Sequence, residues 1–239
     1  MGQVTQTNTA TILSQQLLLS VTEQLKVPLL QIARQAELSQ LNAQDASEII
    51  QTTAESALRL IDNYVLGVRL SLESEQLAIE PVSVSSVLYD TGQQLDKAAR
   101  QYGIDLELNI AGRFGPVMAN KDGLQAALVS LGTSLIEALP AMGGQQLTLH
   151  LATHRCRYGI VAGLYADVEK MSGEVLRQGR RLQGKARQPL AQLSHGSAAG
   201  IFVADAILQA MDLELKVSRH HRLYGLGTVL QPSRQLQLV

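Results

Sequence analysis

The chain has 239 residues, of which 46% are hydrophobic and 17% are charged, and its formal net charge is −1. This length allows two small domains, and the composition is that of a folded protein. The near-zero charge, the 3% aromatic content and the lack of tryptophan argue against a nucleic-acid partner. No apolar run is long enough for a membrane span, and the single cysteine, Cys156, suits a reducing compartment. We therefore expect a cytoplasmic protein.

The N-terminal third of the chain has the pattern of two amphipathic helices. Apolar residues recur every three or four positions from about residue 10 to 41 and again from residue 50 to 68. A polar turn at residues 40–46 separates the two stretches, and Pro28 is expected to bend the first helix. Such a hairpin buries its apolar faces either in a dimeric four-helix bundle, which we expect, or against the rest of its own chain.

The remaining chain has the pattern of an α+β fold, an α/β sandwich with helices on one face of a mixed sheet. We place the boundary between the two parts near residues 73–79 and assign domains to residues 1–76 and 77–239. The spacing of apolar residues predicts one helix that ends near residue 102 and two more at 121–139 and 203–211. It also predicts strands at 79–82, 104–108, 116–119, 147–153, 158–165, 213–217 and 227–231.

One octapeptide and this order of elements resemble a known family. Residues 22–29, TEQLKVPL, are similar to the phosphoacceptor box of sensor histidine kinases, which has the form S/T-H-E-L-R/K-x-P-L. Glu23 stands in the position of the nucleophilic histidine and Gln24 in that of the acidic residue, whereas Lys26 and Pro28 match. The resemblance covers almost the whole chain. It implies a dimerisation hairpin followed by an ATP-binding domain of the Bergerat type.

The resemblance also implies a magnesium-binding N-x-x-x-N helix and a D-x-G-x-G adenine turn, and both are altered. In the matching helix, residues 128–136, both asparagines are replaced by serine, at Ser130 and Ser134. A hydroxyl is a shorter and weaker magnesium ligand than a carboxamide. The candidate adenine turn, residues 164–171, contains no glycine. Asp167 is then either a relic of the adenine-binding aspartate or an exposed turn residue.

A third motif of the family, the phosphate-cradling G-x-G-x-G-L turn, is resembled by residues 196–201. Gly196 and Gly200 are kept, Ser197 lies between them, and Ala198 replaces the central glycine. The turn is either a residual anion site or an ordinary helix entry. The basic segment 170–189 corresponds to the family's lid over ATP, and is either a strip for phosphate or an acidic partner, or a solvated loop.

The five histidines offer no replacement chemistry at the level of sequence. None has metal-ligand spacing with a cysteine or carboxylate, so we expect structural or solvated side chains at His150, His154, His195, His220 and His221.

These coordinated losses predict a catalytically inactive histidine-kinase-like homodimer that holds neither ATP nor magnesium. It is expected to bind a response-regulator receiver or a partner kinase through the face around Glu23, Gln24, Lys26 and Pro28. A phosphotransfer protein or a weakly active kinase is an alternative, although residues 1–76 contain no histidine to accept a phosphoryl group. A further alternative is an allosteric module that binds a small ligand in a reused nucleotide pocket, lined by Leu128, Leu131, Leu135 and Val203.

Overall fold

The structure is a computed structural model that describes residues 76–110, 112, 114–142, 147–167 and 197–233, together with helical positions between residues 29 and 70. Those helical positions are 29, 30, 32, 36, 50, 54, 57, 58, 61, 62, 65–67 and 70. The phosphoacceptor-like octapeptide before Leu29, the turn at 40–46 and the basic segment 170–189 lie outside the described residues. The predicted four-helix bundle and the domain boundary stay predictions.

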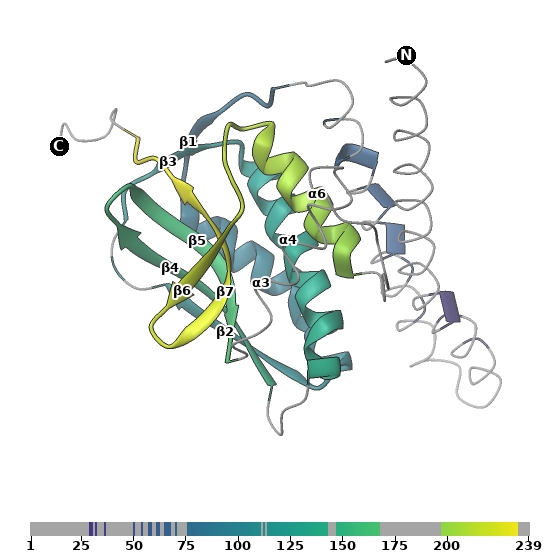
Figure 1. Ribbon diagram of the computed structural model, residues 1–239. Coiled ribbons are helices and arrows are strands. Elements are labelled where there is room, and N and C mark those ends of the chain that lie inside the picture. The colour runs from purple at the N-terminus through teal and green to yellow at the C-terminus, as the bar shows by residue number, and fades with distance from the viewer. Residues whose placement is uncertain are drawn as a thin grey trace, which may run out of the picture.

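A five-stranded mixed sheet forms one layer of the molecule, with strand order β2-β4-β5-β7-β6. Strands β2 and β4 are parallel, and the other neighbours are antiparallel. A separate antiparallel pair, β1 and β3, lies at one end of the sheet (Figure 1). The strand bounds are β1 (Glu80–Val82), β2 (Ile104–Ile110), β3 (Val117–Ala119), β4 (Leu147–Cys156), β5 (Gly159–Ala166), β6 (Lys216–His220) and β7 (Leu223–Leu230).

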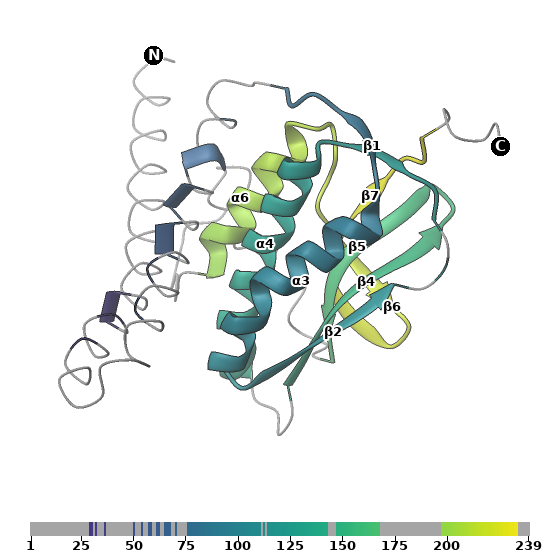
Figure 2. The same cartoon turned by 180° about the vertical axis from the view of Figure 1, so that it is seen from behind.

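Three α-helices cover one face of this sheet (Figures 1 and 2). They are α3 (Val84–Gln101), α4 (Lys121–Ala138), which continues into the 3-10 turn η1 (Leu139–Met142), and α6 (Ser197–Gln209). Polar caps fix two of the starts, because Ser83 accepts a hydrogen bond from the Ser86 amide and Asn120 accepts one from the Gly123 amide.

The hydrophobic core fills the space between the helices and the sheet. It includes fully buried leucines from both layers, such as Leu88 of α3, Leu131 of α4, Leu149 of β4 and Leu164 of β5. The sequence-predicted order of strands and helices and the mixed α+β class are confirmed. Among the described residues, no helix combines the length and hydrophobicity that crossing a bilayer requires.

Several predicted bounds are wrong. Strand β2 continues to Ile110 rather than ending at residue 108, and β7 begins at Leu223 rather than at residue 227. Strand β4 continues through His154 to Cys156, because the tight turn at residues 157–158 pairs Cys156 with Gly159. Helix α6 begins at Ser197 rather than at residue 203. Strand β6 begins at Lys216 rather than at residue 213, because the helix ends in a left-handed residue, Asp212, after which the Leu213 amide still bonds back to Leu208.

Two of the described helical positions of the N-terminal part, Gly67 and Leu70, contact the helix layer or the core. A Cβ placed on Gly67 would lie 3.1 Å from the side chain of Val203 on α6. Ala57 and Leu70 are buried, and Leu70 belongs to the core. Gly67 and Leu70 therefore pack against the C-terminal part of the chain, and the choice between a dimeric bundle and own-chain packing of the hairpin stays a prediction.

Candidate functional site

The two serines that replace the family's asparagines lie in the interface between α4 and α6. Ser130 is 2% exposed and Ser134 is fully buried, and neither hydroxyl has a hydrogen-bond partner among the residues that the structure describes. A Cβ on Gly200 would overlap Ser134 Oγ and would lie 2.6 Å from the carbonyl oxygen of Ser130. The backbone of α6 therefore lies directly against the positions on α4 that matter for magnesium in the resembled family.

This arrangement does not fit a magnesium site. Magnesium requires near-octahedral oxygen coordination and keeps several water ligands, which need open space around the protein oxygens. The hydroxyls of Ser130 and Ser134 are enclosed by a helix-helix contact and present no such space. Elsewhere in the described ranges, no three histidine, cysteine, aspartate or glutamate side chains gather around a common point.

Of the other predicted nucleotide residues, Gly200 packs directly against these serines. Asp167 is an exposed bend residue directly after β5, as one reading of the sequence expected. Ser197 begins α6, Gly200 lies inside its first turns, and Gly196 lies outside the described residues. The four residues whose pocket would favour a ligand-binding module belong to the packed core: Leu128, Leu131, Leu135 and Val203.

The opposite face of the sheet carries a cluster that the sequence did not predict. Tyr165 is fully buried there, although it points away from the helix layer. Its ring lies on bare backbone, since a Cβ on Gly163 would approach the Tyr165 hydroxyl to 2.8 Å and one on Gly227 to 3.2 Å. The hydroxyl donates a hydrogen bond of 3.2 Å to Ser218. Burial raises the pKa of Tyr165 to about 12, partly offset by that bond.

The β6–β7 hairpin reaches this tyrosine through Ser218 and His220 of β6. Strands β4 and β6 are not neighbours in the sheet, yet the Nδ1 atoms of His154 and His220 are 3.3 Å apart. The rings of His220 and Tyr165 have centroids 5.4 Å apart. The close approach of β7 to β5 requires glycine at Gly225, where a Cβ would overlap the carbonyl oxygen of Leu164.

The surroundings of His154 and His220 favour the neutral form of each imidazole. Burial, and next the charge of His221, lower the pKa of His154. Burial also lowers the pKa of His220, and the neighbouring imidazoles of His221, His154 and His150 add to this shift. With one ring protonated at Nδ1 and the other not, the 3.3 Å contact is a hydrogen bond between neutral imidazoles.

Two cavities are described, and the first opens beside this cluster. One, of about 500 Å³, lies between the segment before β3 and the tip of the β6–β7 hairpin, and its lining residues are Gly112, Phe114, His154, Arg155, Arg219, His220 and His221.

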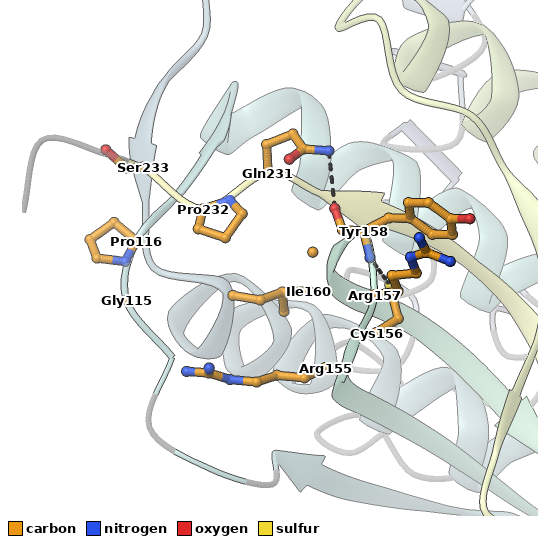
Figure 3. A pocket seen from close by; sticks show the side chains of 11 residues that line it. Gly115, Pro116, Arg155, Cys156, Arg157, Tyr158, Ile160, Gln231, Pro232 and Ser233 are labelled. Carbon is orange, nitrogen blue, oxygen red and sulfur yellow. Dashed lines mark hydrogen bonds between the residues drawn. The ribbon is translucent and has the colours of Figure 1, made fainter. Parts of the chain in front are cut away.

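The second cavity, of about 470 Å³, lies at the end of the sheet beside the β4–β5 turn. Figure 3 shows Pro116 and Pro232 on one side of it, and Arg157 and Tyr158 on the other. Gln231 closes the gap by donating a hydrogen bond of 3.1 Å to the Tyr158 carbonyl oxygen.

No protein-family model and no curated protein sequence matches the chain. Solved structures do match. The chain is similar to the histidine kinase AdeS of Acinetobacter baumannii, with 11% identity and a TM-score of 0.51, over 87% of this chain and 97% of that one. It is also similar to full-length ShkA in complex with AMPPNP, with 10% identity and a TM-score of 0.55, over 92% of this chain and 46% of that one.

The chain has the fold of a histidine-kinase core.

Within this histidine-kinase-like fold, α4 with Ser130 and Ser134 is the helix that the sequence resemblance singled out. The predicted docking residues of the hairpin, Glu23, Gln24, Lys26 and Pro28, lie outside the described residues.

The sequence did not predict the histidine cluster because His154 lies on β4 and His220 on β6, and these two strands are not neighbours in the sheet. One signal was present in the sequence. Alternation along β4 places His150, His154 and Cys156 on the same face, and the pairing of β4 with β5 sets His150 opposite Tyr165. The approach of His220 depends on the glycines of β5 and β7, and a one-dimensional pattern does not encode it.

Proposed function

We propose that this histidine-kinase-like protein works in two-component signalling by binding a receiver domain or a partner kinase, without transferring phosphoryl groups itself. The contact of Gly200 with Ser130 and Ser134 is the observation that supports this most directly. Phosphoryl transfer depends on metal ions that neutralise charge between the β- and γ-phosphates. The helix pair offers hydroxyls enclosed in packing at the positions where the family needs that metal.

The acceptor side of the proposal rests on the sequence. Glu23 stands in place of the acceptor histidine, and a carboxylate does not form the phosphoramidate that an imidazole nitrogen forms. Residues 1–76 contain no histidine, which disfavours a phosphorelay through this hairpin. The kept residues Lys26 and Pro28 then serve the shape and contact surface of the helix. We propose this surface as the docking face for the partner.

A nucleotide titration tests the loss of the kinase reaction. ATP is titrated calorimetrically into the full chain at neutral pH, with magnesium and then with an excess of chelator. We expect no saturable binding below millimolar ATP in either condition. Micromolar affinity that depends on magnesium would contradict the proposal. Labelled phosphate that moves onto the chain from a phosphorylated receiver would favour the phosphorelay instead.

A charge reversal tests the docking face separately. Glu23→Arg is expected to abolish pull-down of a cognate receiver domain, because it reverses the charge in the middle of the proposed surface. Glu80→Arg is the matched control, since Glu80 is an exposed residue of β1 outside the hairpin. Binding that survives Glu23→Arg, or that fails equally in both variants, would move the docking surface elsewhere.

A further inference from the structure

The cavity of about 500 Å³ beside the β6–β7 hairpin has an unusual distribution of charge. Among the described residues, its lining contains Arg155, Arg219 and three histidines, and no aspartate or glutamate. The nearest acidic side chain by strand pairing is Glu107, which lies 3.2 Å from the Nδ1 atom of His150 and is not part of the lining. A cavity with this lining attracts negative charge.

Several elements around the cavity carry titratable or charged side chains. They are Glu107 on β2, His150, His154 and Arg155 on β4, Tyr165 on β5, Arg219 and His220 on β6, and His221 and Arg222 in the turn after β6. Tyr165 stays neutral in the physiological range, because burial raises its pKa to about 12. Glu107 is therefore the only negative charge among these groups, and its partner is His150.

The histidine pair provides buried hydrogen-bonding groups at the wall of the cavity. His220 is 2% exposed, and its Nε2 atom has no hydrogen-bond partner among the described residues. Its Nδ1 atom is 3.3 Å from the Nδ1 atom of His154. A doubly protonated imidazole donates from both nitrogens, so an anion in the cavity would stabilise a charged His154 or His220 that the empty environment disfavours.

The remaining wall is aromatic. The guanidinium of Arg155 lies 5.7 Å from the centre of the Phe114 ring, and that of Arg219 lies 4.3 Å from the centre of the Tyr224 ring. The Arg219 guanidinium also donates a hydrogen bond to the Tyr224 hydroxyl, and Tyr224 is outside the cavity lining. Phe114 provides an aromatic surface within the lining. A volume of about 500 Å³ is in the range of small-molecule sites.

We propose that this cavity binds a small anionic ligand, with its phosphate or carboxylate group between Arg155, Arg219 and the His154–His220 pair and its apolar part on Phe114. A divalent cation fits less well, since the two guanidinium groups repel it and no three metal-ligating side chains gather in the described part of the chain. Among the described residues, the lining includes none from α4 or α6, so the site is separate from Ser130, Ser134 and Gly200. It is therefore independent of the nucleotide region and of the proposed function.

The probes are inorganic phosphate, phenyl phosphate and benzoate, each titrated into the full chain at pH 6.0 and pH 7.5. Binding is followed by calorimetry and by the side-chain NMR signals of the histidines. We expect saturable binding that is several-fold tighter at pH 6.0, because the anion favours protonated imidazole. Phenyl phosphate is expected to bind more tightly than inorganic phosphate if Phe114 contacts the ligand. Benzoate distinguishes a carboxylate site from a phosphate site.

Variants decide where the probe binds. Arg219→Gln and, separately, Arg155→Gln are expected to weaken phenyl phosphate at least roughly tenfold, as loss of a charged hydrogen bond does. Arg222→Gln is the control, because it removes the same charge from the same hairpin but from outside the cavity lining. A melting curve for each variant verifies the fold. No saturable binding of any probe, equal weakening by Arg222→Gln, or saturation of the histidine signals by zinc chloride alone would overturn the proposal.

Discussion

At the scale of single residues, the close approach of α4 to α6 depends on Gly200, because its side chain is a single hydrogen atom. Gly200→Ala would bring a Cβ into Ser134 Oγ and to 2.6 Å from the Ser130 carbonyl oxygen, which is backbone and cannot rotate away. We expect this variant to lose roughly 1–3 kcal/mol of unfolding free energy, the usual cost of overpacking a core. Urea denaturation measures it.

The matched control for that change is Gly115→Ala, because nothing lies within 4 Å of a Cβ at Gly115. It is expected to leave the urea midpoint nearly unchanged. A Gly200→Ala midpoint equal to that of Gly115→Ala would show that α6 stands further from α4 than described here. The reading of Ser130 and Ser134 as packing residues would then lose its basis.

Tyr165 gives a second prediction at this scale. Tyr165→Phe removes the hydrogen bond to Ser218 and is expected to cost about 0.5–1.5 kcal/mol at pH 7. In the wild type the pKa of this tyrosine is about 12 in the folded state, against about 10 for the unfolded chain. The folded state therefore keeps a proton that the unfolded state loses, so stability falls as pH rises above about 10.

Denaturation curves at pH 7, 10 and 11 test both parts. Tyr165→Phe should show a smaller alkaline loss of stability than the wild type. The control Tyr158→Phe changes a tyrosine that is 70% exposed and should behave like the wild type at each pH. An unchanged alkaline slope in Tyr165→Phe would mean that this hydroxyl is not the buried group responsible.

At the scale of elements, the β6–β7 hairpin is the part most sensitive to acid. The pKa values of His154 and His220 are lowered by burial and by neighbouring histidines, so the unfolded chain binds these protons more readily than the folded one. Their contribution to stability is complete above the unfolded pKa of about 6.5 and is lost as pH falls below it. We expect the hairpin to remain predominantly closed, with opening more frequent at pH 5.0 than at pH 7.5.

Hydrogen exchange of the β6 and β7 amides at pH 7.5 and pH 5.0 measures this opening. His220→Gln is expected to flatten the pH dependence, because it removes one of the two shifted imidazoles. His221→Gln is a useful comparison, since it removes a neighbouring charge and should instead lessen the shift of the other two. Exchange rates with no pH dependence beyond that of free peptides would contradict the acid-sensitive hairpin.

Sequence patterns predicted most of the secondary-structure elements, but not the contacts between elements that are distant in the chain. Apolar alternation predicted the strands and helices because each of them has one face on the core. The same alternation ended β4 too early, since His154 and Cys156 face outward and carry no apolar signal. The resemblance of short motifs singled out Ser130 and Ser134, and both lie on the buried side of α4. It could not place Gly200 against them, because that contact joins segments far apart in the chain.

At the scale of the whole molecule, the N-terminal helical positions divide into two sets. Ala57 and Leu70 are buried, and Gly67 contacts Val203 of α6, so this set packs on the helix layer. Other apolar positions face solvent: Leu58 is 60% exposed and Val65 is 61% exposed. Their spacing of seven residues places them on one side of a helix. An exposed apolar stripe opposite a packed one supports the proposed homodimer, whose interface would cover it.

The final prediction separates these two sets. The double variant Leu58→Glu and Val65→Glu is expected to convert a dimer to a monomer, measured as a halved mass by light scattering, because two charges at the stripe oppose its burial. Leu70→Ala should instead keep the dimer and lower the unfolding free energy by about 2–5 kcal/mol, as a buried leucine does. A wild-type chain that is monomeric at high concentration would refute the dimer. The packed set would still hold the hairpin on α6 in that case, and the docking surface would have to act as a single copy.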